Sequence, residues 1–160
     1  MRLTRLLACA SCLILLAAAN AAADVTVFIG SNSSPTARAI KGAAIGGGVL
    51  VLGFEFEYAT TAEDAAGGAP SLKTAMANGL LQAPFPIARM QPYFTLGVGG
   101  YRERLGTQQE TAFAGNAGGG VKVTLIGPLR ARFDYRMIRL RGDALFPKVH
   151  RVYAGANVAF

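Results

Sequence analysis

The 160-residue sequence contains no tryptophan, one histidine and two cysteines, and only 16% of its residues are charged. Both cysteines, Cys9 and Cys12, lie in an apolar N-terminal segment that we expect to be removed. The remaining chain then has no thiol, which excludes disulfides, thiol catalysis and cysteine-based metal sites. The Asp, Glu and His residues are too scattered to suggest a metal site of another kind. We therefore expect neither a bound metal nor a cofactor.

The N-terminal segment has the three parts of a secretory signal peptide. It starts with Arg2 and Arg5, continues as an apolar run to Ala19, and ends with small alanines that a signal peptidase accepts. We predict a signal peptide over residues 1–23. The apolar run is short for a membrane span of ~20 residues, which disfavours an uncleaved anchor. Removal of the two arginines lowers the formal net charge from +7 to about +5.

The mature chain, residues 24–160, has the length of a single domain and is rich in glycine. It lacks any long amphipathic helical pattern with capping residues. Apolar and polar residues instead alternate with the period of two that is typical of β-strands, and turn-forming residues separate the alternating segments. Eight strands are predicted, over residues 25–31, 38–45, 49–60, 71–83, 93–105, 110–125, 129–140 and 150–160.

Two of these strands have faces of opposite character. One face of the third strand carries Leu52, Phe54, Phe56 and Tyr58, and the other carries Glu55 and Glu57. In the seventh strand, Leu129, Ala131, Phe133, Tyr135 and Met137 lie opposite Arg130, Arg132, Asp134 and Arg136. Such apolar faces approach the ~9–11 residues that a tilted strand needs to cross a bilayer.

Lipid imposes closure on such a sheet, because an open edge in hydrocarbon would leave backbone N–H and C=O groups without partners. We therefore predict an all-β fold: a closed, antiparallel, up-and-down transmembrane β-barrel of about eight strands. The alternative is a periplasmic β-sandwich or lipocalin-like binder that exposes its charged faces to water.

Charged residues on the inward faces form a predicted lumen network. An eight-stranded barrel is only wide enough for side chains to fill it, so we expect these charges to pair with one another rather than line a wide channel. A narrow conduit for small solutes is the alternative. The network comprises Glu55, Glu57, Lys122, Arg130, Arg132, Asp134 and Arg136.

A second basic group lies near the strand ends that we expect to face outward from the cell. Arginine pairs well with phosphate, so this rim is a candidate site for lipopolysaccharide or another anionic surface ligand. Solvated loop charge is the simpler interpretation. The candidate rim comprises Arg102, Arg104, Arg139, Arg141, Lys148 and Arg151.

Together these features resemble the small outer-membrane β-barrel proteins of the opacity-protein and OmpA/OmpX type. The resemblance covers the whole mature chain and is most specific in the terminal "HRVYAGANVAF". In that family, a C-terminal aromatic residue on an alternating strand is the sorting signal that the barrel-assembly machinery reads. The resemblance therefore implies this signal at Val152, Ala154, Ala156, Val158 and Phe160, although the alanines depart from the bulky residues usual in the middle positions.

The same resemblance implies an outer-membrane protein with a structural or cell-surface interaction role. Its expected partners are outer-membrane lipid, lipopolysaccharide and, during biogenesis, the assembly machinery; we expect a monomer that binds no nucleic acid. Some barrels of this size hydrolyse lipids, but His150 is the only histidine and its strand contains no serine. We predict no catalytic residue, with a lipid A-modifying enzyme as the least favoured alternative.

Overall fold

The computed structural model describes residues 22–160, and these form eight strands and no helix. The predicted signal peptide lies outside the described residues except for its last two alanines, which begin the first strand. Within the described part of the chain, no helix is long and apolar enough to cross a membrane. The strands are β1 (Ala22–Ser33), β2 (Ala37–Val49), β3 (Leu52–Thr61), β4 (Ser71–Gln82), β5 (Met90–Leu105), β6 (Gln108–Ile126), β7 (Leu129–Leu140) and β8 (Lys148–Ala159).

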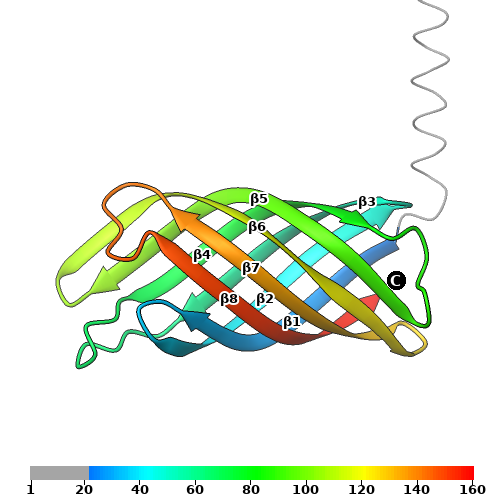
Figure 1. Ribbon diagram of the computed structural model, residues 1–160, viewed down its shortest axis with the longest axis horizontal. Helices are drawn as coiled ribbons and strands as arrows, with labels where there is room; N and C mark the ends of the chain where they lie inside the picture. Colours follow the sequence, from blue (N-terminus) through cyan, green and yellow to red (C-terminus); the bar gives the residue numbers. More distant parts are fainter. Residues whose placement is uncertain (1–21) are drawn as a thin grey trace, which may run out of the picture.

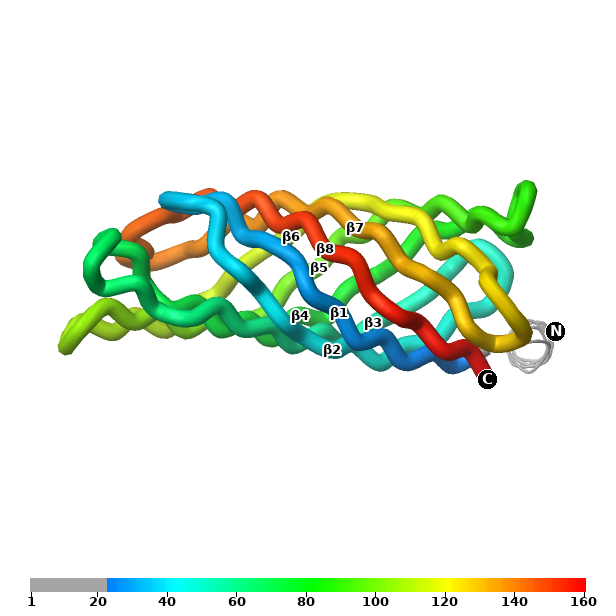
Figure 2. The backbone as a smooth tube through the Cα atoms, turned by 90° about the horizontal axis from the view of Figure 1, so that it is seen from below, coloured from blue at the N-terminus to red at the C-terminus, as the bar shows by residue number. Residues whose placement is uncertain are grey.

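The sheet closes on itself, which confirms the predicted fold class. Each strand pairs antiparallel with its neighbour in sequence, and β8 pairs with β1. At this seam, Phe160 and Ala23 exchange two main-chain hydrogen bonds of 2.9 Å. Figures 1 and 2 show the strands crossing the barrel at a marked tilt. Closure leaves no unpaired edge, so the β-sandwich alternative is wrong.

The connections between strands lie at two ends of the barrel. The terminal end, on the right in Figure 1, holds the C-terminus. The loop end is opposite. The terminal end carries the connections 50–51, 83–89 and 127–128, and the loop end carries 34–36, 62–70, 106–107 and 141–147.

The predicted boundary between the second and third strands is wrong. The sequence predicts a break at Gly46, Gly47 and Gly48, but β2 continues through them to Val49. The chain turns instead at Leu50, which adopts a φ of 55°, a left-handed conformation usually left to glycine. The glycines serve close strand approach: a Cβ on Gly46 would lie 2.3 Å from the main-chain oxygen of Phe54.

The outward face forms a continuous apolar band. Phe94 on β5 and Ile29 on β1, for example, are 74% and 72% exposed. Between the basic residues near the loop end and the terminal end, no outward strand position within residues 22–160 carries a charge. Water-soluble proteins rarely expose an apolar surface of this extent. The band has the character of the lipid-facing surface of a membrane barrel.

Candidate functional site

The barrel interior holds a compact group of ionised side chains, here called the central charge cluster. Alternation along β3, β7 and β8 turns these residues inward, and each is at most 4% exposed. Three arginines face three carboxylates, so the cluster has no formal net charge. It comprises Glu55, Glu57, Arg132, Asp134, Arg136 and Arg151.

Arg136 lies at the centre of this cluster. Its guanidinium nitrogens lie 2.9 Å from Glu55 Oε1, 3.0 Å from Glu57 Oε2 and 2.9 Å from Asp134 Oδ1. The two glutamates come from β3 on one side of the barrel, and the aspartate and arginine come from β7. The arginine therefore ties together strands that are not neighbours in the sheet.

A second arginine, Arg132, is held by carboxylates and aromatic rings. It pairs with Glu55 and lies 3.1 Å from Asp134 Oδ2. Its Nε donates to the Tyr93 hydroxyl at 2.7 Å, and this hydroxyl in turn donates to Asp134. The guanidinium also lies 5.0 Å from the Tyr93 ring centroid and 5.6 Å from that of Tyr153. These contacts supply partners for groups that burial has removed from water.

Two residues of the predicted lumen network lie outside the central charge cluster. Lys122 pairs with Asp24, Nζ to Oδ2 at 2.5 Å, nearer the terminal end. Arg130 is partly exposed and forms no ion pair with any described residue. Both line a cavity of about 310 Å³ that opens at the terminal end.

The assignment of Arg151 to the rim is wrong. Its side chain is buried, with NH1 2.8 Å from Glu57 Oε1 and further hydrogen bonds of 3.1 Å to Asn32 and Thr74. Because β8 begins at Lys148, Arg151 lies well inside the strand. The sequence contained the signal: Arg151 precedes Val152, which alternation had already placed outward.

Apolar side chains fill the interior between the central charge cluster and the loop end. Sequence reasoning missed this layer, although Ile138 and Leu140 share the face of Arg136 on β7. Each of its side chains is at most 5% exposed. It comprises Leu72, Met76, Tyr101, Ala114, Ile138, Leu140 and Val149.

Basic residues also surround the outside of the barrel near the loop end, and we call them the outer basic belt. Every charged residue at an outward strand position within residues 22–160 belongs to it, and none is acidic. The belt comprises Lys41, Lys73, Arg102, Arg104, Arg139 and Lys148, all exposed.

The belt retains four residues of the predicted rim and adds two. Arg141, also predicted, lies exposed in the loop 141–147. Lys41 and Lys73 were missed, although each shares a strand face with apolar outward residues such as Ala43 and Ala75.

Strand register places belt residues side by side. Lys73 on β4 lies directly opposite Arg102 on β5, and Arg139 on β7 lies opposite Lys148 on β8. Lys41 on β2 continues the first row through Thr60 on β3. Within the described residues, no belt side chain forms an ion pair.

The surroundings of His150 do not form a nucleophile–base pair. Its Nδ1 lies 2.8 Å from the Tyr135 hydroxyl, and the Ser33 hydroxyl donates to the main-chain oxygen of His150 rather than to its ring. Within residues 22–160, no group of three His, Cys, Asp or Glu side chains is placed to hold a metal ion.

The predicted assembly signal lies on the outward face of β8, and its last residue, Phe160, directly follows the strand. Val152, Ala154, Ala156, Val158 and Phe160 are all exposed there. This position presents the alternating strand to lipid or to another protein. Its recognition during assembly stays a prediction.

A closed barrel with an apolar exterior and a filled polar interior defines the class of small transmembrane β-barrels. No protein-family model and no curated protein sequence matches the chain. Solved outer-membrane barrels do match its structure. The N-terminal barrel domain of Pseudomonas aeruginosa OprF shares 12% sequence identity, covers 88% of this chain and 100% of its own length, and has a TM-score of 0.67.

Two further neighbours show that proteins of different roles share this fold. Ail, the attachment invasion locus protein of Yersinia pestis, was crystallised with the heparin analogue sucrose octasulfate; it shares 12% identity over 88% of this chain and 99% of its own, with a TM-score of 0.57. The outer membrane enzyme PagL shares 11% identity over 84% and 98%, with a TM-score of 0.54. The chain thus has the fold of the eight-stranded outer-membrane barrels.

Proposed function

We propose that this protein is a non-enzymatic outer-membrane barrel with a cell-surface interaction role, held in the outer leaflet by its outer basic belt. The belt binds phosphates of lipopolysaccharide. The loop end, which carries more connections and the longest one, faces outside the cell, as in other barrels of this class.

The like-charge pairs of the belt carry this proposal. Two cations directly opposite each other on one sheet face repel, and such pairs destabilise a sheet. Lys73 with Arg102 and Arg139 with Lys148 are two pairs of this kind, and no acidic side chain separates them on that face. A phosphate between each pair turns the repulsion into two attractive contacts. The belt also borders the apolar band, at the level where lipid head groups lie.

The interior supports a structural role better than transport. The central charge cluster spans the lumen, and the apolar layer fills the space above it toward the loop end. A solute crossing the barrel would have to break buried ion pairs, each costly to separate.

The proposal is tested by replacing all six belt residues with glutamine. The wild-type protein, extracted from outer membranes in mild detergent, is expected to retain lipopolysaccharide, and the belt variant is expected to lose most of it. Heat-modifiable gel mobility verifies that both proteins are folded barrels. If the folded wild-type and variant proteins retain equal amounts of lipopolysaccharide, the belt does not bind this lipid.

The control variant replaces Arg89 and Arg130 with glutamine. Both lie at the terminal end of the barrel: Arg89 is exposed in the connection 83–89, and Arg130 lines the cavity inside the barrel. Because neither lies at an outward strand position beside lipid, this variant is expected to retain lipopolysaccharide as the wild type does.

A further inference from the structure

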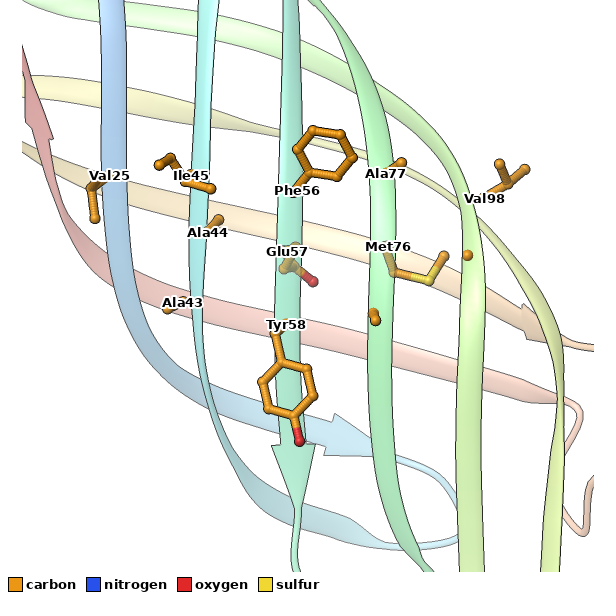
Figure 3. Close-up of a pocket in the computed structure, with 12 residues that line it drawn as sticks. Val25, Ala43, Ala44, Ile45, Phe56, Glu57, Tyr58, Met76, Ala77 and Val98 are labelled. Carbon is orange, nitrogen blue, oxygen red and sulfur yellow. The ribbon is translucent and has the colours of Figure 1, made fainter.

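The lipid-facing surface is hollowed on one side of the barrel. An apolar groove of about 590 Å³ lies across β1 to β5, directly below part of the outer basic belt. Figure 3 shows Phe56 and Tyr58 standing on β3 between the shorter side chains of Ala43 on β2 and Ala77 on β4, with Val98 beyond on β5.

The register of the strands gives the groove two lanes. Tyr58 lies opposite both Ala43 and Ala75, and Phe56 lies opposite Ile45 on the β2 side and Ala77 on the β4 side. The aromatic residues therefore form a ridge, with a short lane over β2 that ends at the exposed Ile45 and a longer lane over β4. Val98, opposite Ala77, walls the second lane on its far side.

A basic side chain lies at the loop-end side of each lane. Lys41 is two residues from Ala43 on β2, and Lys73 is two residues from Ala75 on β4, so both point outward above the groove. Arg102 lies opposite Lys73. Adjacent strands are ~4.8 Å apart, which separates Lys41 from the Lys73–Arg102 pair by roughly 10 Å.

We propose that this groove is a specific site for one lipid A molecule of the outer leaflet. Its two phosphates bind at Lys41 and at the Lys73–Arg102 pair, and two of its acyl chains lie in the lanes beside Phe56 and Tyr58. This inference rests on the proposed function and narrows it to a single site on β2 to β5.

The dimensions and charges favour this lipid over a glycerophospholipid. From Lys73 to Ala77 the β4 lane runs four residues, roughly 13 Å along the strand, which at a strand tilt of ~35–45° covers about 10 Å of the ~15 Å hydrocarbon depth of one leaflet. A phospholipid with one phosphate satisfies only one of the two cationic positions. A disaccharide that carries two phosphates and several chains satisfies both positions and both lanes at once.

The first test fills the groove without changing its charge. Ala77→Phe places an aromatic ring in the β4 lane. Ala117→Phe is the matched control, because Ala117 is also exposed and outward but lies on β6, outside the groove. Native mass spectrometry of each protein, extracted in mild detergent, counts the lipid A molecules that remain bound.

Wild-type and Ala117→Phe proteins are expected to retain one tightly bound lipid A, and Ala77→Phe is expected to weaken its binding about tenfold. If the two phenylalanine variants retain equal amounts of lipid A, the groove is not its binding site. If the six-glutamine belt variant still loses lipopolysaccharide, that outcome leaves the proposed function standing. If the belt variant retains lipopolysaccharide, both the proposed function and the groove site are overturned.

The second test identifies the occupant. Refolded protein is placed in nanodiscs that contain either bisphosphorylated lipid A or phosphatidylglycerol. Selective retention of lipid A, lost in Lys73→Gln/Arg102→Gln but kept in Arg89→Gln/Arg130→Gln at the terminal end, supports the assignment. Equal retention of phosphatidylglycerol overturns it.

Discussion

Removal of Arg136 should destabilise the barrel more than any surface substitution. The side chain has no solvent exposure and pairs with Glu55, Glu57 and Asp134. Arg136→Met would leave three buried carboxylates facing only two arginines. Breaking a buried pair by removing one partner typically costs about 3–5 kcal/mol, because the remaining charge stays out of water. We expect the free energy of unfolding to fall by about that amount.

A compensating substitution isolates the electrostatic part of this loss. Adding Glu55→Gln to Arg136→Met restores neutrality, because Arg132 keeps Asp134 at 3.1 Å and Arg151 remains at 2.8 Å from Glu57. The double variant should therefore lose less stability than the sum of the two single variants, with a coupling of about 1–3 kcal/mol.

The chain has no tryptophan, so the assay follows folding by other signals. Urea unfolding in detergent micelles is monitored by circular dichroism and by the fraction that migrates as a compact, heat-modifiable barrel. A loss below about 1 kcal/mol for Arg136→Met, or strictly additive effects in the double variant, would refute a tightly coupled neutral cluster.

Three further outcomes are expected. Liposomes that carry the purified protein should not swell rapidly in isosmotic sugar, and rapid sugar entry would contradict a filled lumen. Glu103 is 3% exposed near the loop end, and neither of its carboxylate oxygens has a hydrogen-bond partner within the described residues. Glu103→Gln removes this buried charge, so it should stabilise the barrel by about 1 kcal/mol at pH 7, and a lower free energy of unfolding in urea titration would contradict this. Phe160→Ala should lower the folded fraction in outer membranes several-fold, measured by heat-modifiable mobility, and unchanged assembly would argue against the terminal signal.

Alternation was enough to predict the barrel and the interior position of the charged side chains on β3 and of Arg130, Arg132, Asp134 and Arg136 on β7. Over residues 54–57 of β3 and 129–136 of β7, each apolar outward residue is followed by a charged inward one, and a period of two permits only one assignment of faces. The same rule places Arg151 inside and Lys73 outside. Arg151 was misassigned because it lies next to the predicted start of its strand at residue 150, and Lys73 was missed because both faces of β4 carry polar and apolar residues.

Pairing partners could not be predicted in the same way. Which carboxylate meets Arg136 depends on the relative shift between β3 and β7, which lie four strands apart and share no main-chain hydrogen bonds. The turn at Leu50 was also hidden, since a leucine in a left-handed conformation carries no turn signal and the nearby glycines suggested the wrong position.

The central charge cluster also makes the early strands of the chain depend on the last two. Glu55 and Glu57 arrive on β3, early in the chain, but the arginines that neutralise them come from β7 and β8, the last strands made. An intermediate that lacks β7 and β8 therefore has unpaired carboxylates at Glu55 and Glu57 and also an unpaired strand edge. Pairing of β7 and β8 with the rest of the sheet neutralises the carboxylates and closes the barrel in one step. Forms that lack this hairpin are therefore expected to be more susceptible to proteolysis.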